Sequence, residues 1–360
     1  MIRKPISRRT ALAGIASTAA LAATAPRPAR AAGSITVLNW QGYGTDEAWA
    51  LEAFAADTGI EVVHDYFNSE QEMLTKLRTA PGTYDVVLVN NIYVMTAADE
   101  GLIQPIDPGA ISNFQDLSPP LRDSDRFVRG GQYYAISWVW GVTSFAYNTE
   151  RIATRPDSIE ALWAPEHAGK VGWRDDALES VQLGAIATGQ DMNDPGDMEL
   201  IKQKLMALKP QIATFWSSED EWNKYMAAGD YDIAVYWSGS AARSKKAMGL
   251  PVEFVVPKEG AIGWFDGLCI ASGAPNPEGA AQFIDYMVDP AFYVPWDNQI
   301  GAPASANIEA NLALPEDAMN RTILGDPAVA ERLQWMAPVS DERLQTNQEL
   351  WDEVKTSFVQ

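Results

Sequence analysis

Short apolar runs alternate with amphipathic segments along most of the chain, which predicts a repeating order of strands and helices. Residues 34–39 (SITVLN) are rich in β-branched side chains and are typical of a buried strand, as are residues 60–67 and 84–89. The first helix between them is expected to be capped by Thr45 and to end at Gly59. This β-α-β-α-β-α order predicts a parallel, doubly wound sheet.

A second series of elements follows in the later part of the chain. Two separate strands are expected at residues 134–137 and 142–147, and a strand at residues 170–173 leads into a helix that starts at Asp176. The remaining predicted strands cover residues 232–236, 252–256 and 262–270. The chain is therefore long enough, and has enough elements, for two α/β units.

The carboxyl ends of the predicted strands indicate a binding region, because ligands of open α/β sheets bind just beyond these ends. Five segments qualify, and they begin at Trp40, Asn90, Asp175, Trp237 and Trp264. Three of the five contribute a tryptophan at a position where a core aromatic residue is not required.

Three carboxylates stand near these strand ends. Asp176 and Glu179 are spaced i, i+3 and so share one face at the start of a helix, although the helix dipole alone also favours acidic residues there. Asp266 follows Trp264 by two positions, which places both on the same side of an extended strand. Because aspartate is disfavoured within strands, either ligand binding or a structural hydrogen-bonding role is expected for Asp266.

Carboxylates beside aromatic rings form a site suited to an alkyl ammonium. A carboxylate offsets the hydration that the amine loses, and aromatic faces attract the cation and cover its methylene groups. Carboxylates on both sides of a cleft would select a ligand with two amines at a set distance.

Composition narrows the class of protein. The single cysteine, Cys269, cannot form a disulfide within the chain, and the two histidines lack the spacing of metal ligands. The sequence contains no G-x-S-x-G, phosphate-loop or dinucleotide-binding motif. We therefore expect a binding protein with no metal, no cofactor and no catalytic residues. A secreted enzyme that uses the three carboxylates as general acid and base is an alternative.

The N-terminus has the features of an export signal. An alanine-rich run at residues 11–25 follows basic residues, and residues 29–31 (ARA) form a small-x-small motif, so cleavage is expected near Ala31. Arg8 and Arg9 resemble a twin-arginine signal, with an ordinary secretory signal as the alternative. Removal of six basic residues takes the formal net charge from −21 to −27, which argues against nucleic acid and anionic membranes as partners.

The order of these features resembles the spermidine/putrescine-binding proteins of bacterial ABC importers, which are periplasmic solute-binding proteins. The resemblance covers essentially the whole mature chain. It is carried by residues 38–43 (LNWQGY), 84–90, 140–143 (WGVT), 174–179 (RDDALE), 237–241 (WSGSA), 257–260 (PKEG) and 264–268 (WFDGL). It implies an α/β, two-lobed periplasmic binding protein of type II, in which each lobe is a doubly wound sheet and the ligand cleft lies between the lobes.

The resemblance also implies a domain division, partners and site residues. After the signal peptide (residues 1–31), lobe 1 is expected to comprise residues 32–140 plus 267–310, and lobe 2 residues 141–266 plus 311–360. The implied partners of this periplasmic monomer are a polyamine or related small amine and the ABC importer permease in the inner membrane. The expected substrate-binding residues are Trp40, Gln41, Tyr43, Asn90, Ile92, Asp176, Glu179, Trp237, Trp264 and Asp266.

Some positions depart from the family pattern. Ile92 and Ala302 stand where aromatic residues are usual, and the family's late glutamine contact has no clear counterpart around Gln334. An amine is still the expected ligand despite these changes, but the sequence does not identify which polyamine binds. The alternative is the same fold with another solute, such as an amino acid, a sugar or a ferric complex. A carboxylate ligand would need an arginine in the cleft, for which Arg174 is the candidate.

Overall fold

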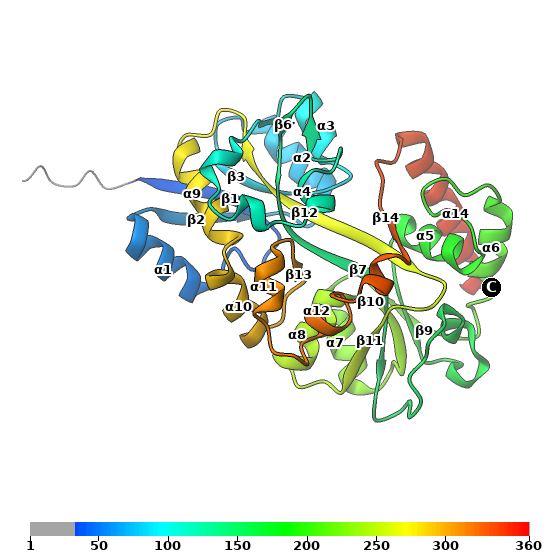
Figure 1. Cartoon of the computed structure of the whole chain (residues 1–360). Coiled ribbons are helices and arrows are strands. Elements are labelled where there is room, and N and C mark those ends of the chain that lie inside the picture. Colours follow the sequence, from blue (N-terminus) through cyan, green and yellow to red (C-terminus); the bar gives the residue numbers. More distant parts are fainter. Residues whose placement is uncertain (1–32, 360) are drawn as a thin grey trace, which may run out of the picture.

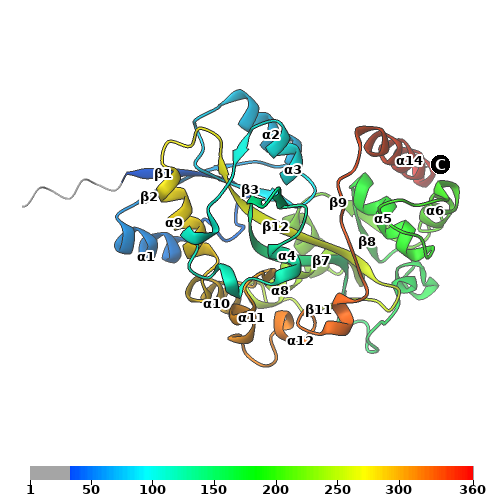
Figure 2. The same ribbon diagram turned by 45° about the horizontal axis from the view of Figure 1, so that its top comes forward.

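Two long strands, β7 (Ile136–Asn148) and β12 (Ala261–Ala271), cross the middle of the molecule and contribute to both of its parts (Figures 1 and 2). They pair antiparallel to each other, and their register shifts between Asp266 and Gly267. This computed structural model describes residues 33–359, so the expected signal segment and the cleavage site near Ala31 lie outside the described residues.

The first part of the molecule is built on strands in the order β2-β1-β3-β12. The first three strands are mutually parallel, and β12 joins them antiparallel to β3. The predicted α/β class is therefore confirmed, with a mixed rather than purely parallel sheet. The elements of this part are β1 (Ser34–Asn39), α1 (Ala48–Thr58), β2 (Glu61–Tyr66), α2 (Glu70–Thr79), β3 (Val86–Asn90), α3 (Val94–Asp99), β4 (Ile103–Gln104), α4 (Pro119–Arg122), β5 (Val128–Arg129), β6 (Gln132–Tyr133), α9 (Pro277–Met287), α10 (Pro290–Gln299), β13 (Ala304–Ser305) and α11 (Ile308–Leu312).

The second part continues the sheet from β7 in the order β7-β10-β8-β9. Strand β8 is parallel to both of its neighbours, whereas β10 is antiparallel to β7. Its elements are β8 (Val171–Arg174), α5 (Ala177–Ala187), α6 (Met198–Met206), β9 (Ile212–Trp216), α7 (Glu219–Ala228), β10 (Ile233–Trp237), α8 (Ser238–Lys246), β11 (Val252–Val255), α12 (Met319–Thr322), α13 (Pro327–Ala330), β14 (Leu333–Trp335) and α14 (Asp341–Val359).

Local sequence explains several helix ends. The Ser69 hydroxyl accepts a hydrogen bond from the backbone N–H of Glu72 at 3.1 Å, as the capping-box spacing predicts. Asp176 caps α5 by accepting from the N–H of Glu179 at 2.9 Å. Gly59 ends α1 with a left-handed backbone (φ 71°), a conformation that glycine adopts without a steric cost.

The prediction that Thr45 caps the first helix is wrong. Thr45 is fully buried, and its hydroxyl accepts a hydrogen bond from the Asn39 side-chain amide at 2.8 Å. This bond ties the β1–α1 connection to the end of the strand, so the helix starts three residues later than Thr45, at Ala48.

Two strand predictions also need correction. Residues 134–137 and 142–147 do not form separate strands, because β7 runs without a break from Ile136 to Asn148. Gly141 interrupts the apolar pattern, but its missing side chain makes room for the ring of Trp264, and a Cβ there would lie 2.5 Å from Trp264 Cζ2. Trp264 itself lies within β12 rather than at a strand end.

Buried side chains form separate clusters on the two sides of the crossing strands. The first part has one large cluster around Phe54 and Trp296. The sheet of the second part is covered on both faces, with Trp351 of α14 in one cluster and Trp222 of α7 in the other. Within residues 33–359, none of the helices combines the length and the apolarity that a membrane crossing requires.

Candidate functional site

Asp266 is a buried carboxylate on a strand that the two parts share. It lies opposite Asn90 of β3, whose amide Nδ2 donates to Asp266 Oδ1 at 2.9 Å. The Tyr43 hydroxyl, from the loop after β1, donates to Asp266 Oδ2 at 3.0 Å. The residue is 6% exposed. Three predicted site residues, Tyr43, Asn90 and Asp266, are therefore in direct contact.

The charge of Asp266 is held by neutral donors alone. Burial raises its pKa from 3.8 to about 6, and the hydrogen bonds from Asn90 and Tyr43 oppose that rise. Within residues 33–359, no lysine, arginine or histidine forms an ion pair with Asp266. At neutral pH the site therefore holds a buried negative charge that a bound cation would offset.

Glu70 and Tyr93 belong to the same region and were missed from the sequence. Burial, and then the nearby Asp266, raise the pKa of the Glu70 carboxyl well above its usual value. Its Oε2 atom is buried and has no hydrogen-bond partner within the described residues. Burial and then Glu70 raise the pKa of Tyr93 to about 12, with a smaller contribution from Asp176. Acidic groups of both parts therefore influence the Tyr93 hydroxyl.

A second cluster of polar groups surrounds Glu179 on α5. Trp237 at the end of β10 donates its indole Nε1–H to Glu179 Oε1 at 3.1 Å, and the Thr143 hydroxyl of β7 donates to the same atom at 3.4 Å. Thr143 and Trp237 are direct partners in the β7–β10 pairing. Burial raises the pKa of Glu179, and Arg174 opposes the shift. Two predicted residues, Glu179 and Trp237, are therefore in contact.

Arg174 supplies a cation to this second cluster. Its Nη1 atom lies 2.7 Å from Glu179 Oε2 and 3.5 Å from Asp176 Oδ2. Its guanidinium carbon lies 4.5 Å from the centre of the Trp237 ring, at cation–π distance. Asp176 therefore has two roles, because it also caps α5 through Oδ1.

The other predicted residues differ in their surroundings. The Trp40 ring packs edge-on against Phe67 at 4.6 Å between centroids, and Trp264 is partly buried against Gly141. Gln41 is exposed, with no side-chain hydrogen bond among the described residues. Ile92 is 6% exposed and packs in the same hydrophobic cluster as residues of the second part.

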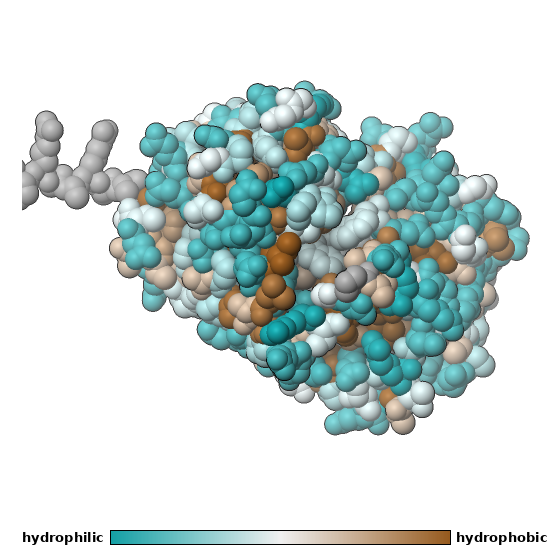
Figure 3. All heavy atoms as spheres, in the orientation of Figure 1, coloured by the Kyte–Doolittle hydropathy of each residue, from teal (hydrophilic) through white to brown (hydrophobic). Residues whose placement is uncertain are grey.

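Side chains of the second part also lie close to the Asp266 cluster. Arg243 of α8, which pairs with Glu219 (Nη2 to Oε2, 2.6 Å), lies 6.0 Å from the centre of the Tyr43 ring in the first part. Gly239 and Gly301 allow the start of α8 to pack closely against residues 301–303, because a Cβ on either glycine would lie within 2.7 Å of backbone. In the space-filling view, the molecule is notched between the part that carries α3 and the part that carries α14 (Figure 3).

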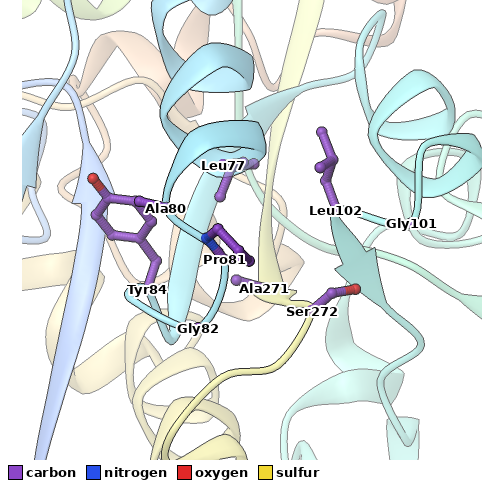
Figure 4. Close-up of a pocket in the computed structure, with 9 residues that line it drawn as sticks. All are labelled: Leu77, Ala80, Pro81, Gly82, Tyr84, Gly101, Leu102, Ala271 and Ser272. Carbon is purple, nitrogen blue, oxygen red and sulfur yellow. The ribbon is translucent and has the colours of Figure 1, made fainter.

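A small cavity elsewhere in the molecule is not a candidate ligand-binding site. It lies near the start of β3 and the end of β12 (Figure 4), whereas Asn90 is the last residue of β3 and Asp266 lies in the middle of β12. Its volume of about 40 Å³ is room for a few water molecules rather than for an organic ligand. It is lined, without any charged side chain, by Leu77, Ala80, Pro81, Gly82, Tyr84, Gly101, Leu102, Ala271 and Ser272.

Two positions that depart from the family pattern, Ala302 and Gln334, have structural roles within the protein. Ala302 is fully buried, and its N–H donates to Asp297 Oδ1 at 3.1 Å. Gln334 Oε1 accepts from the Met192 backbone N–H at 2.8 Å and so joins β14 to the segment after α5. Within residues 33–359, no group of three or more His, Cys, Asp or Glu side chains has the arrangement of a metal site.

Comparison with known proteins identifies the family. The profile of the family described as "Bacterial extracellular solute-binding protein" matches residues 49–320. The spermidine/putrescine-binding periplasmic protein of Escherichia coli (strain K12) is 33% identical over 295 residues, which cover 80% of this chain and 83% of that protein. Spermidine/putrescine-binding periplasmic protein 1 of Haemophilus influenzae is 30% identical over 345 residues, covering 93% of this chain and 92% of that protein.

A solved structure has the same fold over nearly the whole described chain. The spermidine/putrescine ABC transporter substrate-binding protein PotD from Streptococcus pneumoniae, in complex with calcium and HEPES, superposes with a TM-score of 0.81 and 25% sequence identity. The match covers 91% of this chain and 99% of that one. The family profile, the relatives and the fold agree, and the chain belongs to the bacterial extracellular solute-binding protein family.

Proposed function

We propose that this protein captures a polyamine of the putrescine/spermidine class in the periplasm and delivers it to an ABC importer in the inner membrane. The observation that carries the proposal is the buried carboxylate of Asp266, which is held by Tyr43 and Asn90 and has no cationic partner among the described residues. The names of two relatives, 33% and 30% identical to this chain, support the same ligand class. A binding role of this kind requires no catalytic group.

The chemistry of the site fits an alkyl ammonium. One ammonium of the ligand bonds to Asp266, which removes the cost of the buried charge. Trp40, Tyr43, Trp237 and Trp264 cover the methylene groups, and each cation–π contact contributes about 0.5–2 kcal/mol. The other ammonium lies near Asp176 and Glu179. Gln41, Asn90 and Ile92 complete the proposed binding residues.

Closure of two lobes around the ligand would couple capture to delivery. We assign residues 32–140 plus 267–310 to lobe 1 and residues 141–266 plus 311–360 to lobe 2. The boundaries on the crossing strands lie beside Gly141 in β7 and beside the register shift at Asp266 and Gly267 in β12. These are positions where a strand bends most easily. Ligand contacts to both lobes would favour the closed form, which then docks on the permease.

Export and assembly complete the proposal. The signal peptide is removed near Ala31, by the twin-arginine or the general secretory route, and the mature protein acts as a monomer. Size-exclusion chromatography with light scattering measures the mass of the mature protein, and N-terminal sequencing of protein recovered from the periplasm locates the cleavage site.

Calorimetric titration of the mature protein with putrescine, cadaverine, spermidine and spermine tests the proposed function. Binding of at least one amine at micromolar concentration is expected, with lysine and glucose as controls of similar size. Absence of heat with all four amines at millimolar concentration, in protein that melts cooperatively, would reject the polyamine assignment. Thermal shift measures the same binding independently, because a ligand of the native state raises the melting temperature.

A further inference from the structure

Arg174 occupies surroundings that suit a bound ammonium. Its guanidinium contacts the carboxylates of Glu179 and Asp176, and it lies over the face of Trp237. Two carboxylates and an aromatic face are the groups that we expect around one amine of a polyamine. Arg174 is the last residue of β8, so the strand directs this cation to the end of the sheet where the candidate site lies.

Counting charges gives the number of ligand cations that the site can balance. In the second cluster, Asp176 and Glu179 carry two negative charges and Arg174 one positive charge, which leaves one negative charge. On the shared strand β12, Asp266 adds one more. Arg243 and Glu219 neutralise each other. Burial favours the protonated, uncharged form of Glu70 in the empty protein. The empty site therefore holds two net negative charges, which a dication balances and a trication exceeds by one.

We propose that Arg174 is a specificity-determining residue, which takes the place of one ligand ammonium and restricts the site to diamines. This inference rests on the proposed function and specifies that the ligand carries two positive charges. A triamine would bring its third ammonium toward Arg174, and like charges in a water-poor site repel each other strongly. A diamine spans from Asp266 to the remaining charge at Asp176 and Glu179. Asp176 Oδ2, which lies 3.5 Å from Arg174, and Glu179 Oε2, which lies 2.7 Å from it, are the carboxylate oxygens nearest this remaining charge.

A ligand carboxylate near Arg174 is disfavoured by the same geometry. The guanidinium already contacts two carboxylates, and Glu179 is 9% exposed. A third carboxylate there would face two negative charges at short range with little solvent to screen them. An amino acid with an amine at one end and a carboxylate at the other is therefore a test ligand that we expect not to bind.

The test compares ligands of different charge in three variants of the mature protein. Arg174→Gln removes the cation, Arg174→Lys keeps it, and Lys355→Gln is the matched control. Lys355 also neutralises an acidic residue of the 174–179 segment, because its Nζ atom lies 2.8 Å from Asp175, but it projects from α14. Calorimetry with putrescine, spermidine and 4-aminobutanoate gives the ratio of the two amine affinities for each protein, and circular dichroism confirms that each variant is folded.

In wild type, putrescine is expected to bind roughly tenfold or more tightly than spermidine. Arg174→Gln is expected to reduce or reverse this preference by roughly tenfold to a hundredfold, while Arg174→Lys and Lys355→Gln keep it. An unchanged ratio in Arg174→Gln, with both amines still binding, overturns the inference and leaves the proposed function intact. Binding of 4-aminobutanoate that depends on Arg174 also overturns it. If wild type binds neither amine, the inference fails, and the proposed function fails with it only if cadaverine and spermine also do not bind.

Discussion

Asn90 and Asp266 lie opposite each other on the neighbouring strands β3 and β12, and the Asn90 amide donates a 2.9 Å hydrogen bond to the Asp266 carboxylate. The strand pairing fixes both residues, so the carboxylate is held in place before any ligand arrives. Its donors are neutral, which orients the charge without cancelling it. A rigid, uncompensated carboxylate of this kind favours a cationic ligand at the expense of the stability of the empty protein.

Replacing Asp266 with asparagine is expected to weaken amine binding and to make the empty protein more stable. Loss of the charge should weaken amine binding by about 2–5 kcal/mol, because the ligand ammonium is left without its counter-ion. The rise in the Asp266 pKa from 3.8 to about 6 corresponds to about 3 kcal/mol of destabilisation of the charged form. The variant should therefore unfold at a higher urea concentration than wild type at pH 8.

The control for this comparison is Asp99→Asn, which removes an exposed carboxylate from α3 in the same part of the molecule. It should change neither the affinity nor the urea midpoint appreciably. If Asp266→Asn retained wild-type affinity, Asp266 would not contact the ligand.

Amine affinity is expected to depend on pH around the pKa of Asp266. Since that pKa is raised to about 6, the carboxylate required for binding becomes protonated below this pH, and affinity should fall as the pH drops from about 7 to 5. The contribution of Asp266 to the free energy of unfolding changes with pH in the opposite direction, because it increases as the pH falls. The protonated form is favoured in the native state, so the contribution of Asp266 is fully present below pH about 4 and is lost as the pH rises through about 6. Titrations and urea unfolding at matched pH values measure both trends, and a flat affinity profile between pH 5 and 7 would argue against this role.

Glu70 should make binding release a proton. Burial and Asp266 raise the pKa of Glu70 in the empty protein, whereas an ammonium nearby would lower it. Calorimetry near pH 7 in two buffers of different ionisation enthalpy measures the number of protons released. Wild type should release more than Glu70→Gln. Glu278→Gln, in which an acidic residue is lost from the first turn of α9, is the control. Equal proton release by wild type and Glu70→Gln would place Glu70 outside the site.

Adding a methyl group at Gly141 should displace Trp264. The new Cβ would lie 2.5 Å from Trp264 Cζ2, so the ring must move or the strands must separate. We expect Gly141→Ala to cost about 1–3 kcal/mol in the free energy of unfolding and to weaken amine binding. Gly196→Ala is the matched control, because a Cβ at Gly196 meets nothing within 4 Å. Affinity equal to wild type in a folded Gly141→Ala variant would show that the Trp264 ring does not cover the ligand.

Much of the candidate site could be predicted from the sequence, for reasons of local chemistry. An aspartate inside an apolar strand and an acidic pair at a helix start are unusual enough to indicate Asp266, Asp176 and Glu179, and the structure places each in a polar cluster. Glu70 was overlooked because it follows a serine that forms a helix cap, which explains an acidic residue there without a ligand.

Other features depend on distant packing and leave little local signal. The continuity of β7 was missed because nearly all of its residues are buried, which removes the alternation that marks a half-buried strand. The ion pairs of Arg174 depend on where the β8–α5 turn brings two carboxylates and on the position of Trp237, more than sixty residues later in the sequence. A local pattern predicts the residue types of such a cluster, but not which of them neutralise each other.

A crystal structure of the mature protein with putrescine tests the proposed binding mode most directly. One ammonium should lie within hydrogen-bonding distance of Asp266, about 3 Å, and the other near Asp176 and Glu179, with Arg174 still over Trp237. Putrescine bound away from Asp266, or with both ammonium groups exposed to solvent, would contradict the proposed mode of capture.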